Sequence, residues 1–327
     1  MIAPVRNRKV QGIIVAIKAS SEFKGKIREI DSLVDKSPVL NDKLWDLITW
    51  LADYYNTPLG VVAKAALPAN LSTEYEPRSQ LYVKGKIEGE PLADRAKSQI
   101  AVLNHLSTID EFIPAGTLGE IVPNALDVCR KLAEKGWVEL MEKQVIPDLS
   151  GLLLTSIHKE VRFTDYQEQA LCQLKASMDR NKFSPFLLHG VTGSGKTEIY
   201  IEAARHGLKQ NKSVIMLLPE IALTTQISGR FRAAFGDDVA LWHSKLSQSA
   251  RAWTWKKICS GDYKVVVGAR SAIFAPLKNL GLVMVDEEQE SAYKQDSPDP
   301  RYHARDVALM RGKIHDATVV LASATPS

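Results

Sequence analysis

Residues 184–200 read Ser-Pro-Phe-Leu-Leu-His-Gly-Val-Thr-Gly-Ser-Gly-Lys-Thr-Glu-Ile-Tyr, and this stretch decides the fold. The apolar run at 186–188 predicts a buried strand, and the residues after it match the phosphate-binding loop pattern G-x-x-x-x-G-K-T. In such a loop the glycines let backbone N–H groups face an anion, Lys196 places a positive charge on the β- and γ-phosphates, and Thr197 offers a hydroxyl to Mg²⁺. A helix predicted over 196–210 would put the phosphates at its N-terminus. The predicted ATP-binding residues of this loop are Gly190, Val191, Thr192, Gly193, Ser194, Gly195, Lys196 and Thr197.

Strand and helix signals alternate from residue 163 onward. The apolar strand candidates are 186–188, 214–218, 264–268, 282–285 and 318–322. Helical segments lie between them, which is typical of a parallel, doubly wound α/β sheet. We therefore expect the phosphate-binding loop to lie at the carboxyl edge of such a sheet, where open α/β folds bind ligands.

An acidic group follows one of these strands, in Val283-Met-Val-Asp-Glu-Glu-Gln289. Asp286, at the carboxyl end of the strand, would hold Mg²⁺ through water, and Glu287 would orient and deprotonate the attacking water. The predicted catalytic residues are Lys196, Asp286 and Glu287, and the predicted metal ligands are Thr197 and Asp286. Ser323-Ala-Thr325 follows the last strand, and we expect it to hydrogen-bond to the acidic motif.

Gln167, in Thr164-Asp-Tyr-Gln167, precedes the loop by about two dozen residues and has two interpretations. Its amide can both donate to and accept from an adenine edge, which makes it a predicted ATP-binding residue. It can equally serve as part of a helix cap at the start of a helix over 165–177. The two roles are compatible.

Polar loops after other strands carry side chains that suit nucleic acid. Leu218-Pro-Glu-Ile-Ala-Leu-Thr-Thr-Gln226 and Gly268-Ala-Arg-Ser-Ala-Ile-Phe274 each follow a strand, and Arg270 and Ser271 are predicted to contact a DNA backbone. The segment 293–305 is aromatic and basic just after the acids. Tyr293 and Tyr302 are predicted to stack on bases, while Lys294, Arg301 and Arg305 are predicted to bind phosphates.

The N-terminal segment 6–28 contains seven basic residues and one acid. Between the basic residues, 10–17 has the β-branched character of a strand. A basic β-element suits a phosphate backbone, and the predicted DNA-binding residues there are Arg6, Arg8, Lys9 and Arg28. A solvated surface strand explains the charge equally well.

Two helical patterns lie between this segment and the α/β region. Residues 41–55 predict a helix capped by Asn41, with its apolar side chains on one face. Residues 93–145 predict three helices and then a strand pair, the pattern of a winged helix. That part is acidic rather than basic, with six basic and nine acidic residues over 91–150, which favours a spacer or a protein-docking module over strong DNA binding.

Composition limits the class of protein. The 327 residues are 45% hydrophobic and 24% charged, with a net charge of +4, as in an ordinary globular protein of two or three domains. The N-terminus shows no secretory signal, and no apolar run is long enough to span a membrane. The three cysteines lie far apart without a Cys-x-x-Cys pair, so we predict no zinc site and no disulfide framework in this chain, and a cytoplasmic location.

Together these motifs resemble the PriA family of bacterial primosomal replication-restart helicases, within helicase superfamily 2. The matching stretches are Gly-Val-Thr-Gly-Ser-Gly-Lys-Thr-Glu (190–198), Pro-Glu-Ile-Ala-Leu-Thr (219–224), Gly-Ala-Arg-Ser-Ala-Ile-Phe (268–274), Asp-Glu-Glu (286–288), Tyr-Lys-Gln (293–295), Arg-Tyr-His-Ala-Arg-Asp (301–306) and Ser-Ala-Thr-Pro (323–326). Upstream, Ala52-Asp-Tyr-Tyr55, Pro58-Leu-Gly60 and Ala66-Leu-Pro68 are similar too, so the resemblance covers nearly the whole chain.

The resemblance implies part of a β-rich domain for DNA 3′ ends over 1–75, a winged helix over 76–155 and a RecA-like first helicase lobe over 156–327. It implies an ATP-dependent 3′-to-5′ DNA helicase that recognises stalled or abandoned replication forks and starts primosome assembly. The implied cofactors are ATP and Mg²⁺. The implied partners are forked DNA with a 3′ end, primosome proteins and single-stranded DNA-binding protein.

The resemblance also implies roles for single residues. Arg28 falls near a basic position of the family's 3′-end pocket. Gln289 stands where the family's acidic motif usually has His, and with Ser323 and Thr325 it would relay between the γ-phosphate and the DNA-contacting motif. The family's second lobe, arginine finger and cysteine-rich zinc region have no counterpart among the 327 residues, so a fragment of a longer protein is expected.

Two alternatives stand beside an active helicase. The chain can be a module that binds DNA and nucleotide without unwinding. It can also be an unrelated phosphate-loop kinase, which the aromatic-basic segment and the Ser-Ala-Thr motif disfavour.

Overall fold

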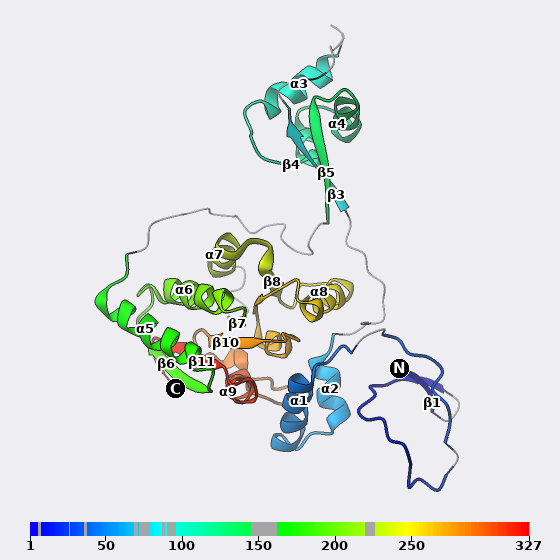
Figure 1. Ribbon diagram of the computed structural model, residues 1–327, viewed down its shortest axis with the longest axis vertical. Coiled ribbons are helices and arrows are strands. Elements are labelled where there is room, and N and C mark those ends of the chain that lie inside the picture. The colour runs from blue at the N-terminus through cyan, green and yellow to red at the C-terminus, as the bar shows by residue number, and fades with distance from the viewer. Residues whose placement is uncertain are drawn as a thin grey trace. The chain divides into compact units, whose positions relative to one another are not determined.

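The computed structural model describes residues 1–5, 8–25, 27–35, 38–68, 71, 79–86, 89, 96–144, 162–219 and 226–326 (Figure 1). The chain divides into two compact units, one formed by Met1–Tyr75 with Ser150–Ser327 and the other by Glu76–Leu149. Among the described residues, no helix has the length and apolar character needed to cross a membrane.

The first unit is built around a six-stranded parallel sheet with the strand order β6-β11-β10-β7-β9-β8. Its strands are β6 (Ser184–His189), β7 (Ser213–Leu217), β8 (Val239–Trp242), β9 (Val265–Gly268), β10 (Leu280–Val285) and β11 (Thr318–Ser323). The five strands that the sequence predicts are all present, and the expected parallel α/β lobe is confirmed. β8 was not predicted, because a four-residue apolar run is too short to show a periodicity.

Helices cover both faces of this sheet. They are α5 (Asp165–Asp179), α6 (Lys196–Lys209), α7 (Gln226–Phe235), α8 (Gln248–Ser260) and α9 (Ala304–His315), with short 3₁₀ turns η3 (Gly236–Asp238), η4 (Arg270–Phe274) and η5 (Ser291–Tyr293). The connections through α6 and α7 run along the sheet in one direction and those through α8 and α9 in the other. Right-handed crossovers therefore place the two pairs on opposite faces, as Figure 1 shows for α6 and α9.

Burial differs sharply between the centre of the sheet and its β6 side. Every residue of β7 is buried, as are five of the six residues of β10. Among the described strands, β6 pairs only with β11, and its residues alternate between half-buried and exposed, with Leu187 57% exposed. The prediction that 186–188 form a buried strand is wrong in this respect, because the strand that leads into the phosphate-binding loop is an edge strand of the described sheet.

The N-terminal part of this unit begins with a hairpin of β1 (Ile2–Val5) and β2 (Arg8–Gln11). The strand predicted over 10–17 is mostly wrong, because only its first two residues belong to β2 and residues 12–17 form no strand. The predicted helix over 41–55 is confirmed as α1 (Asp42–Tyr54), and the Asn41 side chain accepts a hydrogen bond from the Leu44 N–H as its cap. α2 (Leu59–Ala66) follows and packs on α1.

Hydrogen bonds attach this helical pair to the α/β lobe. The Asn41 amide donates to the Pro276 and Leu277 carbonyls at 3.4 and 3.3 Å, so the cap of α1 also contacts the lobe. The Trp255 indole N–H donates to the Val39 carbonyl at 2.9 Å, and α1 packs against α9. The helices of the N-terminal part and the α/β lobe therefore form one packed body.

The second unit is a small α/β module. Its elements are β3 (Ser79–Gly85), α3 (Lys97–Leu106), β4 (Ile113–Pro114), η1 (Ala115–Glu120), α4 (Ala125–Glu134) and β5 (Val138–Gln144), and the sheet is antiparallel in the order β4-β3-β5. The three predicted helices are present, the middle one as a 3₁₀ helix. Among the described residues, 138–144 is one strand that pairs with β3, far upstream, so the predicted strand pair is wrong there, while 145–146, the end of its second strand, lie outside the described residues. The winged-helix assignment stays a prediction.

Candidate nucleotide-binding site and nucleic-acid surface

The phosphate-binding loop connects β6 to α6, and its shape depends on two glycines. Gly193 and Gly195 have φ angles of +80° and +82°, in the left-handed region that other residues adopt only with strain. A Cβ on Gly195 would also lie 2.5 Å from the Gln167 Nε2 atom. The loop pattern in the sequence therefore reflects a backbone that glycine alone forms without cost, with α6 beginning directly after it.

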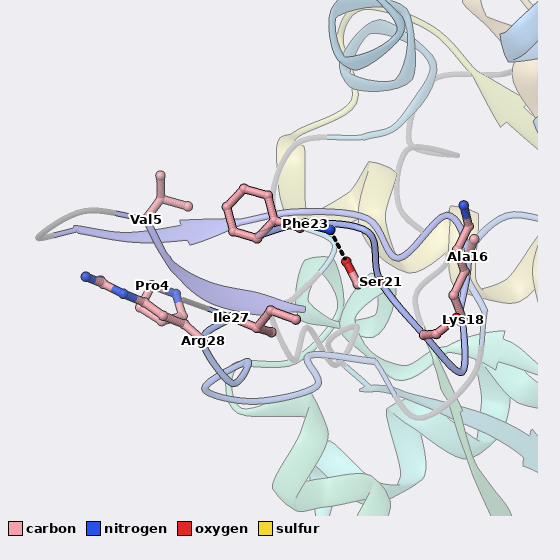
Figure 2. Close-up of a pocket in the computed structure, with 9 residues that line it drawn as sticks. Pro4, Val5, Ala16, Lys18, Ser21, Phe23, Ile27 and Arg28 are labelled. Carbon is pink, nitrogen blue, oxygen red and sulfur yellow. Dashed lines mark hydrogen bonds between the residues drawn. The ribbon is translucent and has the colours of Figure 1, made fainter. Parts of the chain in front are cut away.

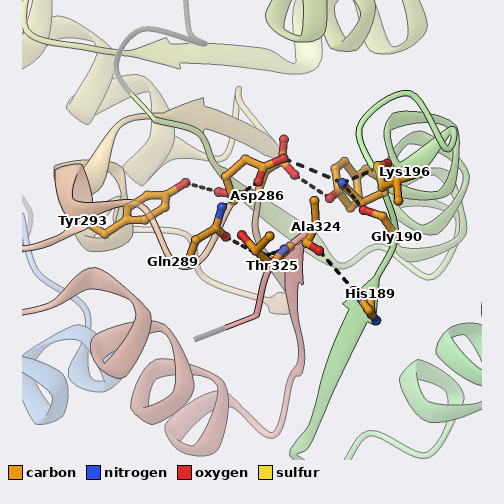
Figure 3. A network of polar contacts seen from close by, with 12 residues as sticks. His189, Gly190, Lys196, Asp286, Gln289, Tyr293, Ala324 and Thr325 are labelled. Carbon is orange, nitrogen blue, oxygen red and sulfur yellow. Dashed lines mark hydrogen bonds and ion pairs between the residues drawn. The ribbon is translucent and has the colours of Figure 1, made fainter.

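Lys196, the first residue of α6, reaches across this loop (Figure 3). Its ammonium group donates to the Gly190 carbonyl at 2.7 Å and to the Val191 carbonyl at 3.5 Å, and it lies 3.7 Å from a Glu287 carboxylate oxygen. The residue is only 9% exposed. The predicted phosphate-binding cation and the predicted water-activating carboxylate are thus in contact at the carboxyl edge of the sheet.

Asp286 begins the acidic turn after β10 and is bound by two tyrosines. Its carboxylate accepts a hydrogen bond from the Tyr200 hydroxyl at 2.7 Å, and its backbone carbonyl accepts one from the Tyr293 hydroxyl at 2.6 Å. Burial raises the pKa of Asp286, against the hydrogen bond from Tyr200, which lowers it. Burial likewise raises the pKa of Tyr200, so its hydroxyl keeps the proton that it donates.

The turn then directs Glu287 toward Lys196 through an unusual backbone conformation. Glu287 has a φ angle of +47°, in the left-handed region, which costs a residue with a side chain roughly 1–2 kcal/mol. The Glu288 N–H donates to the Ala322 carbonyl at 3.0 Å and the Asp286 N–H to the Leu217 carbonyl at 3.0 Å. These bonds to the neighbouring strands β11 and β7 hold the strained turn in place.

A chain of hydrogen bonds connects the acidic turn to the end of β11. The Gln289 amide donates to Glu287 at 2.9 Å, while its oxygen accepts from the Ser323 hydroxyl at 2.6 Å, and Ser323 in turn accepts from the Thr325 N–H at 2.9 Å. The expected hydrogen bond between 323–325 and the acidic motif is therefore present. The Gln289 amide thus supplies both the donor and the acceptor that this chain of contacts uses.

Gln167 makes both halves of a capping box at the start of α5. Its amide oxygen accepts from the Thr164 N–H at 2.8 Å, and the Thr164 hydroxyl accepts from the Gln167 N–H at 3.4 Å. The amide nitrogen donates to the Ser194 carbonyl in the phosphate-binding loop at 2.8 Å. The helix-cap interpretation is thus confirmed, and the contact with adenine stays a prediction.

The donor set at this edge fits Mg²⁺. Mg²⁺ prefers oxygen ligands and is usually bound by one or two carboxylates together with substrate phosphates. Asp286 offers a buried carboxylate, 6% exposed, and among the described residues no Lys or Arg forms an ion pair with it. Thr197 lies on the first turn of α6, beside Lys196. Within the described ranges, no cluster of three or more His, Cys, Asp or Glu residues suited to a metal occurs.

The aromatic-basic segment folds differently from its prediction. Tyr293 and Tyr302 are 1% and 2% exposed, and the Tyr302 ring packs edge-on against Phe274 with centroids 5.3 Å apart. Because a base needs an open ring face, the prediction that these two tyrosines stack on bases is wrong for this conformation. Both belong to the core, where the Tyr293 hydroxyl braces the acidic turn.

The predicted phosphate-binding residues nearby stay on the surface, with internal contacts. Arg270 donates to the Lys294 carbonyl at 2.7 Å and lies over the Tyr302 ring. Ser271 accepts from the Trp242 indole at 3.1 Å, and Lys294 donates to the Arg301 carbonyl at 3.2 Å. Arg301 is paired with Asp299 at 3.1 Å, both exposed. DNA contacts by these residues stay a prediction. Residues 220–225, predicted to line the same edge, lie outside the described residues.

Arg305 has a contact within the lobe that was not predicted, and its contact with a phosphate stays a prediction. Its guanidinium donates to the Glu288 carboxylate at 3.0 Å, and Glu288 is only 3% exposed. The hydrogen bond with Glu288 raises the pKa of Arg305. The pair ties α9 to the acidic turn, a contact that the sequence spacing does not reveal.

The basic residues of the N-terminal segment that the structure describes are exposed. Arg28 lines a hollow with Val5, Lys18 and Phe23 (Figure 2). Lys9 forms an ion pair with Asp31 at 2.8 Å, and Arg8 lies on β2. Arg6 lies outside the described residues. The structure thus brings Arg28 and Lys18 to one surface, and their contact with DNA stays a prediction.

Sequence reasoning missed Tyr200, the partner of the Asp286 carboxylate. A signal was available, because Tyr200 follows Lys196 by four residues, and residues four apart share one face of a helix. It also missed Tyr55, whose hydroxyl accepts from the His303 N–H at 3.1 Å, since no local pattern predicts a contact between residues so far apart in the sequence.

A phosphate-binding loop whose lysine contacts an acidic turn at the edge of a parallel sheet is the arrangement of a phosphate-loop nucleotide-binding fold. The family described as "DEAD/DEAH box helicase" matches residues 164–327, and the chain belongs to this family. A second family model, "3'DNA-binding domain (3'BD)" of PriA, matches residues 1–68.

Curated relatives match nearly the whole chain. "Replication restart protein PriA" from Chlamydia pneumoniae is 40% identical over 339 residues, covering 99% of this chain and 44% of the relative. The protein of the same name from Bacillus subtilis (strain 168) is 33% identical over 396 residues, covering 100% of this chain and 49% of the relative. The chain thus spans less than half the length of these relatives, and the resemblance to PriA is confirmed.

Solved structures that match part of this chain include "Structure of RecG bound to three-way DNA junction", with a TM-score of 0.38 and 22% identity over 51% of this chain and 22% of that one. Another is "Crystal structure of the UvsW helicase from Bacteriophage T4", with a TM-score of 0.35 and 18% identity over 50% of this chain and 54% of that one.

Proposed function

We propose that this chain binds Mg²⁺·ATP and forked DNA as part of an ATP-dependent 3′-to-5′ DNA helicase that acts in replication restart. The observation that carries the nucleotide part is the contact between Lys196 and Glu287 beside the buried Asp286. The replication part rests on the relatives, which are named replication restart proteins.

In this proposal each residue at the carboxyl edge of the sheet has a separate role in binding or hydrolysing ATP. Lys196 binds the β- and γ-phosphates from the start of α6, and Thr197 with Asp286 holds Mg²⁺. When bound, Mg²⁺ would supply positive charge beside the phosphates during transfer. Glu287 orients a water and accepts its proton. Its carboxylate is positioned for this by Lys196 on one side and by Gln289 on the other.

Gln289 and Ser323 are proposed to couple the nucleotide site to DNA. Ser323 ends β11, and its hydroxyl contacts the amide that also contacts Glu287, so a displacement at the γ-phosphate reaches the end of β11 through two hydrogen bonds. The proposed phosphate contacts to DNA are Arg270, Ser271, Lys294 and Arg301 in the lobe and Arg8, Lys9 and Arg28 in the N-terminal part. The matched 3′DNA-binding family model supports the second group.

The same proposal includes protein partners and a cellular location. Single-stranded DNA-binding protein and primosome proteins are the proposed partners, and the cytoplasm is the proposed location. These follow from the similarity to replication restart proteins rather than from a surface of this chain.

A binding role without unwinding is the second candidate, favoured by one observation. The described residues contain a single parallel sheet with one phosphate-binding loop. Translocation needs two lobes that close around nucleotide, and an arginine finger supplied by a second lobe contributes about 10³–10⁵ in rate in related enzymes. We therefore expect the polypeptide 1–327 to bind ATP and 3′-tailed fork DNA, to hydrolyse ATP in trace amounts, and to separate no strands.

The test uses purified 1–327 and three assays: fluorescent-ATP titration, binding of a labelled fork with a 3′ tail, and strand separation. Binding of both ligands without strand separation supports the second candidate. DNA-stimulated hydrolysis with strand separation shows that this polypeptide is itself a helicase. Nucleotide hydrolysis without any DNA affinity favours a kinase-like phosphate-loop enzyme over both.

A further inference from the structure

Tyr200 stands out among the buried polar groups that the proposed mechanism leaves without a role. It lies on α6 and is 1% exposed, and its hydroxyl donates to the Asp286 carboxylate at 2.7 Å. Packing alone does not call for this hydroxyl, because phenylalanine fills nearly the same volume without a polar atom to bury.

One face of α6 contacts two of the three acids of the turn, Asp286 and Glu287. Lys196 and Tyr200 are four residues apart and therefore share a face of the helix. Lys196 contacts Glu287, and Tyr200 contacts Asp286. The helix that begins at the phosphate-binding loop thus positions the carboxylates of both residues, one through a charge and one through a neutral donor.

The backbone of Asp286 is fixed independently of its side chain. The Tyr293 hydroxyl binds the Asp286 carbonyl at 2.6 Å, and the Asp286 N–H binds the Leu217 carbonyl at 3.0 Å. With the main chain held in this way, the remaining freedom of the residue is rotation of its carboxylate. Tyr200 donates to one oxygen of that carboxylate and so sets its orientation.

We propose that Tyr200 is a positioning residue for magnesium, whose hydroxyl orients the Asp286 carboxylate toward the Mg²⁺ of the bound nucleotide. This inference rests on the proposed function, since it needs Mg²⁺·ATP at the loop. Partners that hydrogen-bond to metal-binding side chains fix the orientation of those side chains, and their loss typically weakens metal affinity or activity by about 10–100-fold.

The test is a Mg²⁺ titration of nucleotide binding by the polypeptide 1–327, with a fluorescent, non-hydrolysable ATP analogue. In Tyr200→Phe we expect the half-saturating Mg²⁺ concentration to rise by about 10-fold or more. Affinity in EDTA should stay within about 2-fold of the parent, and high Mg²⁺ should restore binding, because the phosphate-binding loop itself is unaltered. The matched control is Tyr263→Phe, another buried tyrosine, 5% exposed, which precedes β9.

A merely structural role would give different results. Equal loss with and without Mg²⁺, or a Mg²⁺ curve that overlays those of the parent and Tyr263→Phe, overturns the inference. A double-mutant cycle with Asp286→Asn supplies a second measurement. If Tyr200 acts through that carboxylate, Tyr200→Phe should add no further Mg²⁺ effect in the Asp286→Asn background, and additive effects contradict it.

The proposed function fails in a different way. If the parent polypeptide binds no nucleotide, or binds it without any dependence on Mg²⁺, the proposed Mg²⁺·ATP site is refuted. The proposed role of Tyr200 is then refuted with it. A parent that shows the Mg²⁺ dependence while Tyr200→Phe matches it removes only the role of Tyr200. Thermal melting of each variant reports folding separately from both results.

Discussion

The α/β lobe and the N-terminal segment both carry charged residues that are predicted to bind ligands, but the two sets differ in burial and in bonding. In the lobe, Lys196 and Asp286 are buried and bonded to named partners. In the N-terminal segment, Arg8 and Arg28 are exposed, and the side chain of Lys9 is 77% exposed beside Asp31. The charged groups of the lobe are therefore held in a fixed geometry for short-range contacts. The exposed charges of the N-terminal segment can attract a ligand through their combined electrostatic field, which salt screens.

The largest expected effect tests the geometric side of this comparison. Lys196→Ala removes a buried cation that contacts the loop carbonyls, and we expect nucleotide affinity to fall by about 100-fold, because a hydrogen bond to a charged group contributes about 1.5–3 kcal/mol. Fluorescent-nucleotide titration measures it. Lys209→Ala, an exposed lysine at the end of the same helix, is the control and should bind like the parent. Equal affinity in all three proteins would refute the loop assignment.

A buried histidine of the lobe should make its stability depend on pH. Burial next to Arg311 and Lys43 lowers the pKa of His315 to about 3 from the ordinary value of 6.5. Its folded pKa lies below its unfolded pKa, so the unfolded chain binds the extra proton. Stability is then fully present above pH 6.5 and is lost as the pH falls toward 3. At pH 5 the loss amounts to about 2 kcal/mol.

Urea unfolding of the parent and of His315→Leu, at pH 7.5 and at pH 5, measures this effect. The difference in unfolding free energy between the two pH values should be smaller in His315→Leu by about 2 kcal/mol. Carboxylates elsewhere contribute equally to both proteins and cancel. Identical pH dependence in the two proteins would mean that His315 binds its proton in the folded state.

A smaller effect is expected at Gly195, where the loop needs a left-handed backbone. Gly195→Ala should weaken nucleotide binding by about 10-fold, from strain of roughly 1–2 kcal/mol together with the approach of its Cβ to Gln167. Gly60→Ala, on α2 with open space around a Cβ, is the control and should bind nucleotide normally. Unchanged binding by Gly195→Ala would show that the loop adapts its backbone.

The smallest effect belongs to the N-terminal segment. An Arg8→Ala, Arg28→Ala variant should lower the slope of log affinity for fork DNA against log salt by roughly 0.7–0.9 for each lost phosphate contact. Nucleotide affinity should not change. An unaltered slope would place the phosphate contacts of this chain elsewhere, and a matching loss of nucleotide binding would remove the contrast between the two regions.

The sequence could predict the features that depend on local patterns, and most of these lie in the α/β lobe. The loop 190–197 and the acids after β10 were predictable because each pattern reports a local backbone conformation. The Ser323 contact was also predictable, since the carboxyl ends of parallel strands meet at one edge. The burial of Tyr293 and Tyr302 was not, because aromatic residues beside lysines and arginines have the same composition in a core as in a DNA-binding loop.

The features that the sequence could not predict depend on contacts between residues far apart in the chain. The pairing of β5 with β3 joins segments more than fifty residues apart, and no turn signal connects them. The Arg305 pair with Glu288 depends on how α9 packs after the 293–303 segment. In the N-terminal segment, β-branched residues at 12–17 suggest a strand, yet strand formation needs a partner that composition does not reveal.

The attachment of α1 has a mechanical consequence. Asn41 binds the Pro276 and Leu277 carbonyls, Trp255 binds Val39, and the Tyr55 hydroxyl binds the N–H of His303 at the cap of α9. With anchors at both ends of α1, this helix cannot pivot on the lobe without breaking several of them. A force applied to α1 therefore turns the whole lobe, because α1 and the lobe move together as one rigid body.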